Sequence, residues 1–212
     1  YIQGVAAGLM TKSNKIGYIA SFPIPEVIMG INAFTQGLKS VNSDATVSVI
    51  WAMTWYDPGK EADAAKVHIA EGADVLAQHT DTPAMLQTAE EKGAYGFGQG
   101  SDMESFAPKA QLFASVNHWD ISYIEHIEAA LDGTWAAKAA GGNWDTWCSM
   151  KDNCLSVTEL MNMPADVTAK VQAVADSISS GSFDVFQGPI ITNDGKVVAG
   201  GSTLNEGDLW GM

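Results

Sequence analysis

Arginine is absent from this sequence: all eleven basic residues are lysines, set against 25 acidic residues, for a formal net charge of −14. Nucleic-acid-binding surfaces need clustered basic residues to neutralise phosphates, so this charge balance argues against a nucleic-acid partner. The bidentate guanidinium group that holds phosphates is missing as well, which favours a neutral or cationic ligand. Acidity of this degree also keeps a secreted protein in solution, and that explanation stands beside the first.

Cysteine is scarce: Cys148 and Cys154 are the only two in the chain. Two cysteines without nearby histidines are too few for a zinc site. The pair therefore either forms a disulfide in an oxidising compartment or remains as two free thiols. Apolar runs are short as well, and since none reaches the length of a transmembrane helix, the sequence predicts no membrane span.

The chain instead carries the pattern of a globular α/β protein. Its 212 residues, 46% hydrophobic and 17% charged, suffice for one large domain or two small lobes. Short apolar strands alternate with helices, which is typical of right-handed βαβ units around a parallel sheet. Strands are predicted at residues 15–21, 46–51, 73–78, 94–98 and 112–116, and helices at residues 1–10, 26–40, 60–71 and 83–92.

The pattern changes after Trp119. A helix with one apolar face is predicted at residues 121–131. The glycine-, alanine- and tryptophan-rich residues 136–153 predict an irregular loop, where tryptophans form an apolar patch or a partner surface. These tryptophans are Trp135, Trp144 and Trp147. A short strand at 155–160, a helix from Pro164 to about residue 179 and a hairpin pairing 186–192 with 196–198 complete the prediction.

Five loops are predicted to converge on one small-molecule cleft, because ligands of such sheets bind outside the carboxyl ends of the strands. They are residues 22–25, 54–59, 79–82, 99–103 and 117–119. Aromatic side chains in three of these loops suit stacking on a planar ligand, and polar side chains supply hydrogen bonds to it. The candidate ligand-binding residues are the aromatics Phe22, Trp55 and Trp119 and the polar residues His79, Thr80, Asp102, Asn117 and His118.

Each candidate also has a purely structural interpretation. A single aromatic residue often fills a gap in the core, and Asp102 can cap the turn that follows it. For Trp55, between Thr54 and the Tyr56-Asp57-Pro58-Gly59 turn, the strand-end loop favours ligand contact. For Asp102 both roles remain open.

Motifs for catalysis are missing. The sequence has no nucleophile elbow, phosphate-binding Gly-Lys-Ser/Thr loop or His-Glu-x-x-His. Gly96-x-Gly98-x-Gly100 lacks the spacing of a dinucleotide fingerprint. His79 with Asp81 could be read as a fragment of a hydrolase triad, but a triad requires a shared geometry that spacing alone does not provide. The sequence therefore predicts a binding protein without a metal or cofactor, with a nucleoside-processing enzyme and a regulatory sensor as alternatives.

Seven segments of the chain together match one known family. They are residues 16–27 and 30–37, the run Trp55-Tyr56-Asp57-Pro58-Gly59-Lys60-Glu61, and residues 72–75, 78–81, 98–102 and 132–135. In these segments the sequence resembles the basic membrane protein family, the solute-binding lipoproteins of ABC importers. The best-understood members of this family are purine-nucleoside receptors.

The resemblance implies the type I periplasmic-binding-protein fold, in which two Rossmann-like lobes close over a ligand. Family members carry further residues before the position that matches Tyr1, so the chain is expected to be the C-terminal part of such a protein. Residues 1–116 would then form a Rossmann-like ligand-binding lobe and residues 117–119 a hinge. Residues 120–212 would supply remaining elements of the other lobe, a crossover and the C-terminal hairpin.

The resemblance also implies roles for individual residues. The aromatic that stacks on the purine falls at Trp55, and the acidic residue that grips ribose or base falls at Asp102. The polar hinge position, a lysine in the nucleoside receptors, falls near His118, and this departure makes a free purine base a plausible ligand beside a nucleoside. A periplasmic or other extracytoplasmic location, a lipoprotein anchor and an inner-membrane ABC permease as partner are implied as well.

Overall fold

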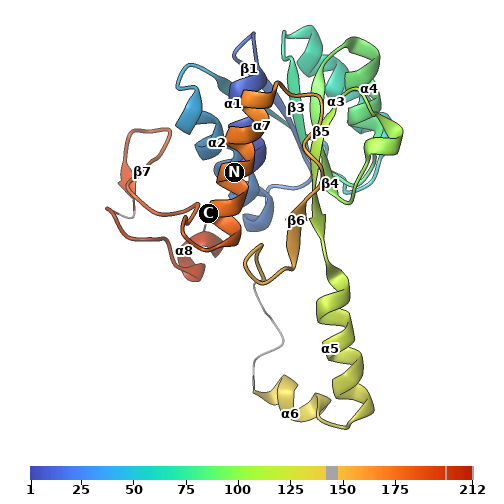
Figure 1. The fold of residues 1–212 in the computed structure, drawn as a ribbon, viewed down its shortest axis with the longest axis vertical. Helices are drawn as coiled ribbons and strands as arrows, with labels where there is room; N and C mark the ends of the chain where they lie inside the picture. The colour runs from blue at the N-terminus through green and yellow to red at the C-terminus, as the bar shows by residue number, and fades with distance from the viewer. Residues whose placement is uncertain (142–147, 199, 212) are drawn as a thin grey trace.

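A six-stranded sheet forms the centre of the protein, of which the computed structural model describes residues 1–141, 148–198 and 200–211. Five strands are parallel, in the spatial order β2-β1-β3-β4-β5, and antiparallel β6 is added beside β5 (Figure 1). The predicted α/β class and parallel sheet are confirmed. The strands are β1 (Lys15–Ala20), β2 (Thr46–Trp51), β3 (Val75–His79), β4 (Tyr95–Gly100), β5 (Gln111–Asn117) and β6 (Leu155–Val157).

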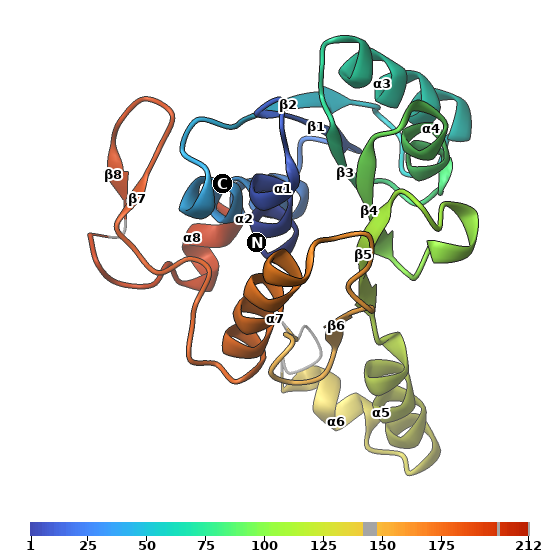
Figure 2. The ribbon, with the colours of Figure 1, turned by 45° about the horizontal axis from the view of Figure 1, so that its top comes forward.

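Helices cover both faces of the sheet, as Figure 2 shows. One face carries α1 (Ile2–Met10), α2 (Pro25–Val41) and α7 (Ala165–Ser179), which share a core with β1, β3 and β5. The other face carries α3 (Pro58–Ala70) and α4 (Ala84–Lys92), which bury a second, smaller core. Burial on both faces explains why the strands read as nearly continuous apolar runs.

Local sequence signals set the ends of these helices. Proline stands in the first turn of both α2 and α3, where its missing N–H has no helical partner in any case. The Asp57 side chain accepts a hydrogen bond from the Lys60 backbone N–H, 3.1 Å away, and so caps α3. Gly93 ends α4 with φ +73°, the left-handed conformation expected of a C-terminal cap.

The C-terminal half differs from the prediction in several places. Residues predicted as loop after Trp135 begin with the helix α6 (Trp135–Ala140), because an alanine-rich run has high helix propensity. The strand expected to reach residue 160 ends at Val157. The hairpin exists but is short, with β7 (Ile190–Ile191) antiparallel to β8 (Val197–Val198). Trp144 and Trp147 lie outside the described residues. Two short helices were not predicted, η1 (Glu104–Phe106) and α8 (Glu206–Trp210).

Helix α5 (Trp119–Leu131) and α6 project from the end of β5, away from the sheet (Figure 1). The predicted apolar residues of α5 are exposed to solvent, and Leu131 reaches 83% exposure. Ile121, Ile124 and Ile127 are exposed as well. None of the described helices combines the length and the apolar character needed to cross a membrane.

Close packing of α1 on α2 depends on glycine. A Cβ atom at Gly4 would lie 1.9 Å from the Phe34 carbonyl oxygen, a backbone atom that no rotamer change can move. We expect Gly4→Ala to lower the free energy of unfolding by about 1–3 kcal/mol, since the clash outweighs the gain in helix propensity. Urea denaturation measures the change. Gly59→Ala is the control, because its Cβ would meet only Asp57 Oδ1 at 3.4 Å. Equal stabilities of the two variants would contradict the prediction.

Candidate functional site

Three of the predicted ligand-binding residues form an aromatic cluster at the carboxyl ends of the strands. The ring centroids of Phe22 and Trp55 are 5.5 Å apart, and those of Trp55 and His79 are 6.0 Å apart. Trp55 lies between the other two and remains 37% exposed. The indole ring of Trp55 is therefore partly exposed to solvent and contacts an aromatic ring on each of two sides.

Sheet topology brings this cluster together. Phe22, Trp55 and His79 belong to the ends of β1, β2 and β3, and β1 runs between the other two strands. Ala20 is in register with Trp51 on one side and with His79 on the other, so the three strands end at the same level. A backbone hydrogen bond of 2.9 Å, from the N–H of Asp81 to the carbonyl of Trp55, joins the two outer loops.

His79 is the titratable member of the cluster. Its Nε2 lies 3.8 Å from Glu26 Oε1, at the start of α2. Burial lowers the pKa of His79 below its ordinary value, and the nearby carboxylates Glu26 and Asp81 offset only part of that effect. The neutral imidazole is therefore favoured near pH 7, and it can act as both donor and acceptor.

A cavity of about 260 Å³ adjoins His79 on the side of α2 and α7. Its polar lining includes Tyr18, Gln99, Ser115 and Ser156. Burial raises the pKa of Tyr18, so its hydroxyl stays protonated and able to donate a hydrogen bond. Small-molecule sites combine apolar walls with a few such convergent polar groups. None of these four residues was among the predicted site residues. Tyr18, Ser115 and Ser156 fall in predicted strands, and only the pleat shows which way they point. Gln99 begins the predicted cleft loop 99–103, although it was not singled out there.

Thr80 is buried, and Asp102 forms hydrogen bonds within the protein. Thr80 is fully buried, and its hydroxyl has no hydrogen-bond partner among the described residues. Asp102 Oδ1 accepts hydrogen bonds from the Glu104 backbone N–H at 3.0 Å and from Gln111 Nε2 at 2.8 Å. The turn-capping role considered for Asp102 is thus present.

The remaining three candidates lie where β5 passes into α5. His118 Nε2 is 2.7 Å from Ser156 Oγ, and its backbone N–H donates to the Cys154 carbonyl at 2.9 Å. Trp119 stacks on Tyr123 with centroids 6.2 Å apart. Asn117 pairs with Leu155 in the sheet. The structure places Asn117 and His118 beside β6, whereas Trp119 packs on Tyr123 within α5.

Cys148 and Cys154 are joined by a disulfide, with their Cα atoms 5.6 Å apart. The bond closes a small loop directly before β6. It lies beside His118, whose backbone binds the Cys154 carbonyl.

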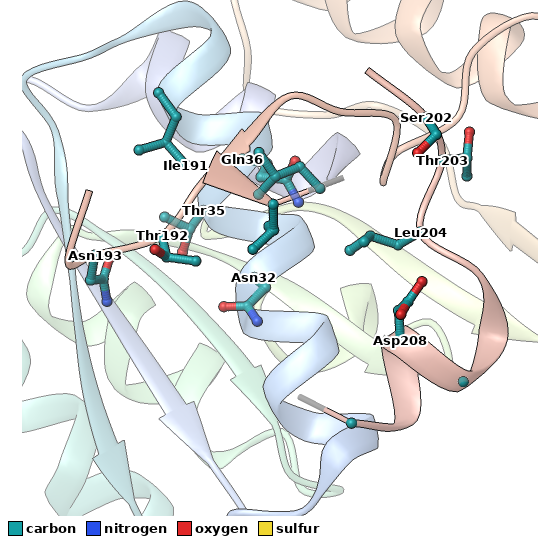
Figure 3. A pocket seen from close by; sticks show the side chains of 14 residues that line it. Asn32, Thr35, Gln36, Ile191, Thr192, Asn193, Ser202, Thr203, Leu204 and Asp208 are labelled. Carbon is teal, nitrogen blue, oxygen red and sulfur yellow. The ribbon is translucent and has the colours of Figure 1, made fainter. Parts of the chain in front are cut away.

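A larger pocket, of about 820 Å³, lies elsewhere (Figure 3). It opens between α2 and the C-terminal hairpin with α8, and Asn32, Thr35 and Asp208 are among the side chains that line it. No predicted site residue contributes to it. Within the described ranges, no group of three His, Cys, Asp or Glu side chains is arranged to hold a metal ion.

Comparison with known proteins identifies the family to which the chain belongs. A family model described as ABC transporter substrate-binding protein PnrA-like, the Bmp family, matches residues 1–181. The chain belongs to the Bmp family. A solved ABC transporter solute-binding protein from Conexibacter woesei superposes with a TM-score of 0.61 at 20% identity, over 87% of this chain and 61% of that one. The fold is therefore that of periplasmic binding proteins.

Two curated relatives are longer than this chain. A purine-binding protein of Brucella abortus is 44% identical over all of this chain and 59% of its own length. A putative ABC transporter glucose-binding protein of Haloferax volcanii is 36% identical over 89% of this chain and 47% of its own length. The chain thus spans about half the length of these two relatives.

The lowered pKa of His79 predicts a dependence of stability on pH. Because the folded protein binds the proton more weakly, the unfolded chain takes it up first as the pH falls. The free energy of unfolding should therefore be highest above about pH 6.5, the ordinary histidine value, and should fall below it. His79→Gln should flatten this fall, while buried His68, whose pKa is also lowered, retains part of it. Urea denaturation between about pH 7.5 and 5.5 measures both slopes, and identical slopes would refute the prediction.

Proposed function

We propose that the protein is the extracytoplasmic solute-binding receptor of an ABC importer, and that it binds a purine base or nucleoside. The observation that carries the proposal is the partly exposed Trp55 ring, held between Phe22 and His79. A flat aromatic face of this kind stacks on a planar heterocycle. Membership of the Bmp family and the 44% identity to a purine-binding protein support this ligand class.

The electrostatics around the cluster fit an uncharged ligand. The chain contains no arginine, and the neutral form of His79 is favoured at its centre. A phosphate group would meet Glu26 near His79 rather than a cation. A base or nucleoside needs only stacking and hydrogen bonds, which His79 and the neighbouring Gln99 and Tyr18 can supply.

We further propose that residues 1–116 form the ligand-binding lobe, 117–119 a hinge, and 120–212 elements of a second lobe, a crossover and the hairpin. The projecting α5 with its exposed apolar face supports this division, since such a face is normally buried against a partner layer. At the proposed hinge, β5 and β6 lie side by side, so that two segments of the chain would connect the two lobes there. Closure of two lobes would present the loaded receptor to an inner-membrane permease.

The role is binding without catalysis, with a lipoprotein anchor and a periplasmic or other extracytoplasmic location. The family and its relatives are named as substrate-binding proteins, which supports this role over a nucleoside-processing enzyme. Incubation of the intact protein with adenosine and inosine, followed by chromatography, tests it. We expect that no free base is released. Turnover of either nucleoside would refute the receptor role and support a nucleoside-processing enzyme.

Replacement of the stacking residue tests the ligand class. Base–aromatic stacking contributes roughly 1–3 kcal/mol, so Trp55→Ala should raise the Kd for the preferred purine about 10- to 100-fold. Trp55→Phe should keep most of the affinity, because a flat ring remains. Isothermal titration calorimetry with adenine and adenosine measures both variants.

The matched control is Trp135→Ala, on α6 at the far end of the projecting arm (Figure 1). It should leave the Kd unchanged. A thermal-shift screen with adenine, adenosine, inosine and glucose completes the test, since a bound ligand raises stability by mass action. Stabilisation by glucose but by none of the purines would overturn the purine proposal.

A further inference from the structure

Glu61 is an unusual residue for the first turns of a surface helix, because its side chain is fully buried. Both carboxyl oxygens accept hydrogen bonds. Oε1 accepts from the backbone N–H of Asp57 at 3.1 Å. Oε2 accepts from Thr82, from the hydroxyl at 2.6 Å and from the backbone N–H at 3.3 Å. A buried carboxyl group is costly unless its oxygens are satisfied in this way.

The two partners of Glu61 belong to the two outer loops of the candidate site. Asp57 ends the loop that carries Trp55, and Thr82 ends the loop that carries His79. Glu61 and Thr82 are 21 residues apart in the chain. The two loops share one further link, from the Asp81 N–H to the Trp55 carbonyl. Glu61 therefore closes a ring of hydrogen bonds beneath the aromatic cluster.

No cation accounts for the burial of Glu61. Across the part of the chain that the structure describes, no lysine or histidine nitrogen lies within ion-pair distance of its carboxyl oxygens. The helix N-terminus of α3 is already capped by the Asp57 side chain, so a second cap does not require burial of a carboxyl group. Unlike the Asp57 cap, the Glu61 carboxyl group joins α3 to Thr82 through hydrogen bonds.

We propose that Glu61 is a positioning residue for the binding site, which holds the Trp55 loop in register with the His79 loop so that the indole ring is preset for stacking. This inference rests on the proposed function. Glu61 touches no ligand in this role; it acts through Trp55. Holding a binding residue in its bound orientation raises affinity because less side-chain and loop entropy is lost on binding.

The conservative variant Glu61→Gln keeps the shape of the side chain but breaks the ring of hydrogen bonds to Asp57 and Thr82. Asp57 and Thr82 donate to different carboxyl oxygens, and an amide replaces one of these oxygens by an NH₂ donor, so the backbone N–H of one of the two residues loses its acceptor. We expect it to weaken adenine binding roughly tenfold. Thr82→Val removes only the 2.6 Å hydroxyl bond and should weaken binding about threefold. Thr82→Val also serves if Glu61→Gln fails to fold.

A double-mutant cycle separates positioning from a general loss of stability. Calorimetry with adenine is carried out on the intact protein and on Glu61→Gln, Trp55→Ala and the double variant. If Glu61 acts through Trp55, Glu61→Gln should change the Kd less than about twofold once Trp55 is alanine. Losses that simply add would overturn the inference. The control is Glu90→Gln, a carboxyl that accepts from the Lys109 N–H at 2.7 Å away from the site, which should leave the Kd unchanged.

A second readout needs no ligand. The contribution of Trp55 to fluorescence is obtained by subtracting the spectrum of the matched Trp55→Phe protein. Glu61→Gln should shift that contribution to longer wavelength, because a loosened indole meets more water, and an unchanged contribution would contradict the inference. If wild type binds neither adenine nor adenosine, the purine ligand is refuted; if Trp55→Ala weakens binding and Glu61→Gln does not, only the role of Glu61 is refuted.

Discussion

The parallel alignment of β2, β1 and β3 is the constraint on which the candidate site depends. Because β1 is hydrogen-bonded on both sides, its end sets the level at which Trp51 and His79 leave the sheet. The loops that follow β1, β2 and β3 are distant in sequence, and the pairing of these strands brings them together. A shift of one residue in the pairing of β3 with β1 would send His79 to the opposite face of the sheet. The aromatic cluster therefore depends on the register of β1 with β2 and β3.

The two faces of the sheet contribute differently to the site. His79 points toward α2, where the cavity with Tyr18 and Gln99 lies. Glu61 and Thr82 lie on the side of α3 and α4 and are buried. The first set is open to a small molecule, whereas the second forms a polar layer beneath the loops. The proposed ligand contacts and the hydrogen bonds that hold the loops thus lie on opposite sides of the same strand ends.

The charged groups beside the cluster are the carboxylates of Glu26 and Asp81, which fits the acidic composition of the whole chain. A protein with net charge −14 and no arginine has little means of holding an anion. Burial keeps the imidazole of His79 neutral in preference to the cation. For the proposed purine ligand, planarity and hydrogen bonding would then be the bases for selectivity.

The α/β class, the order of elements up to β5 and the carboxyl-end loops could be predicted from the sequence, because apolar periodicity, prolines at helix starts and Gly93 at a helix end act locally. Trp55 could be singled out for the same reason. Tertiary structure alone decided that Trp55 packs on Phe22 and His79, that Thr80 turns inward, that Asp102 caps its own turn and that Glu61 bridges two loops. These outcomes depend on which strands are neighbours and on the direction of each side chain in the pleat, and neither is encoded in spacing along the chain.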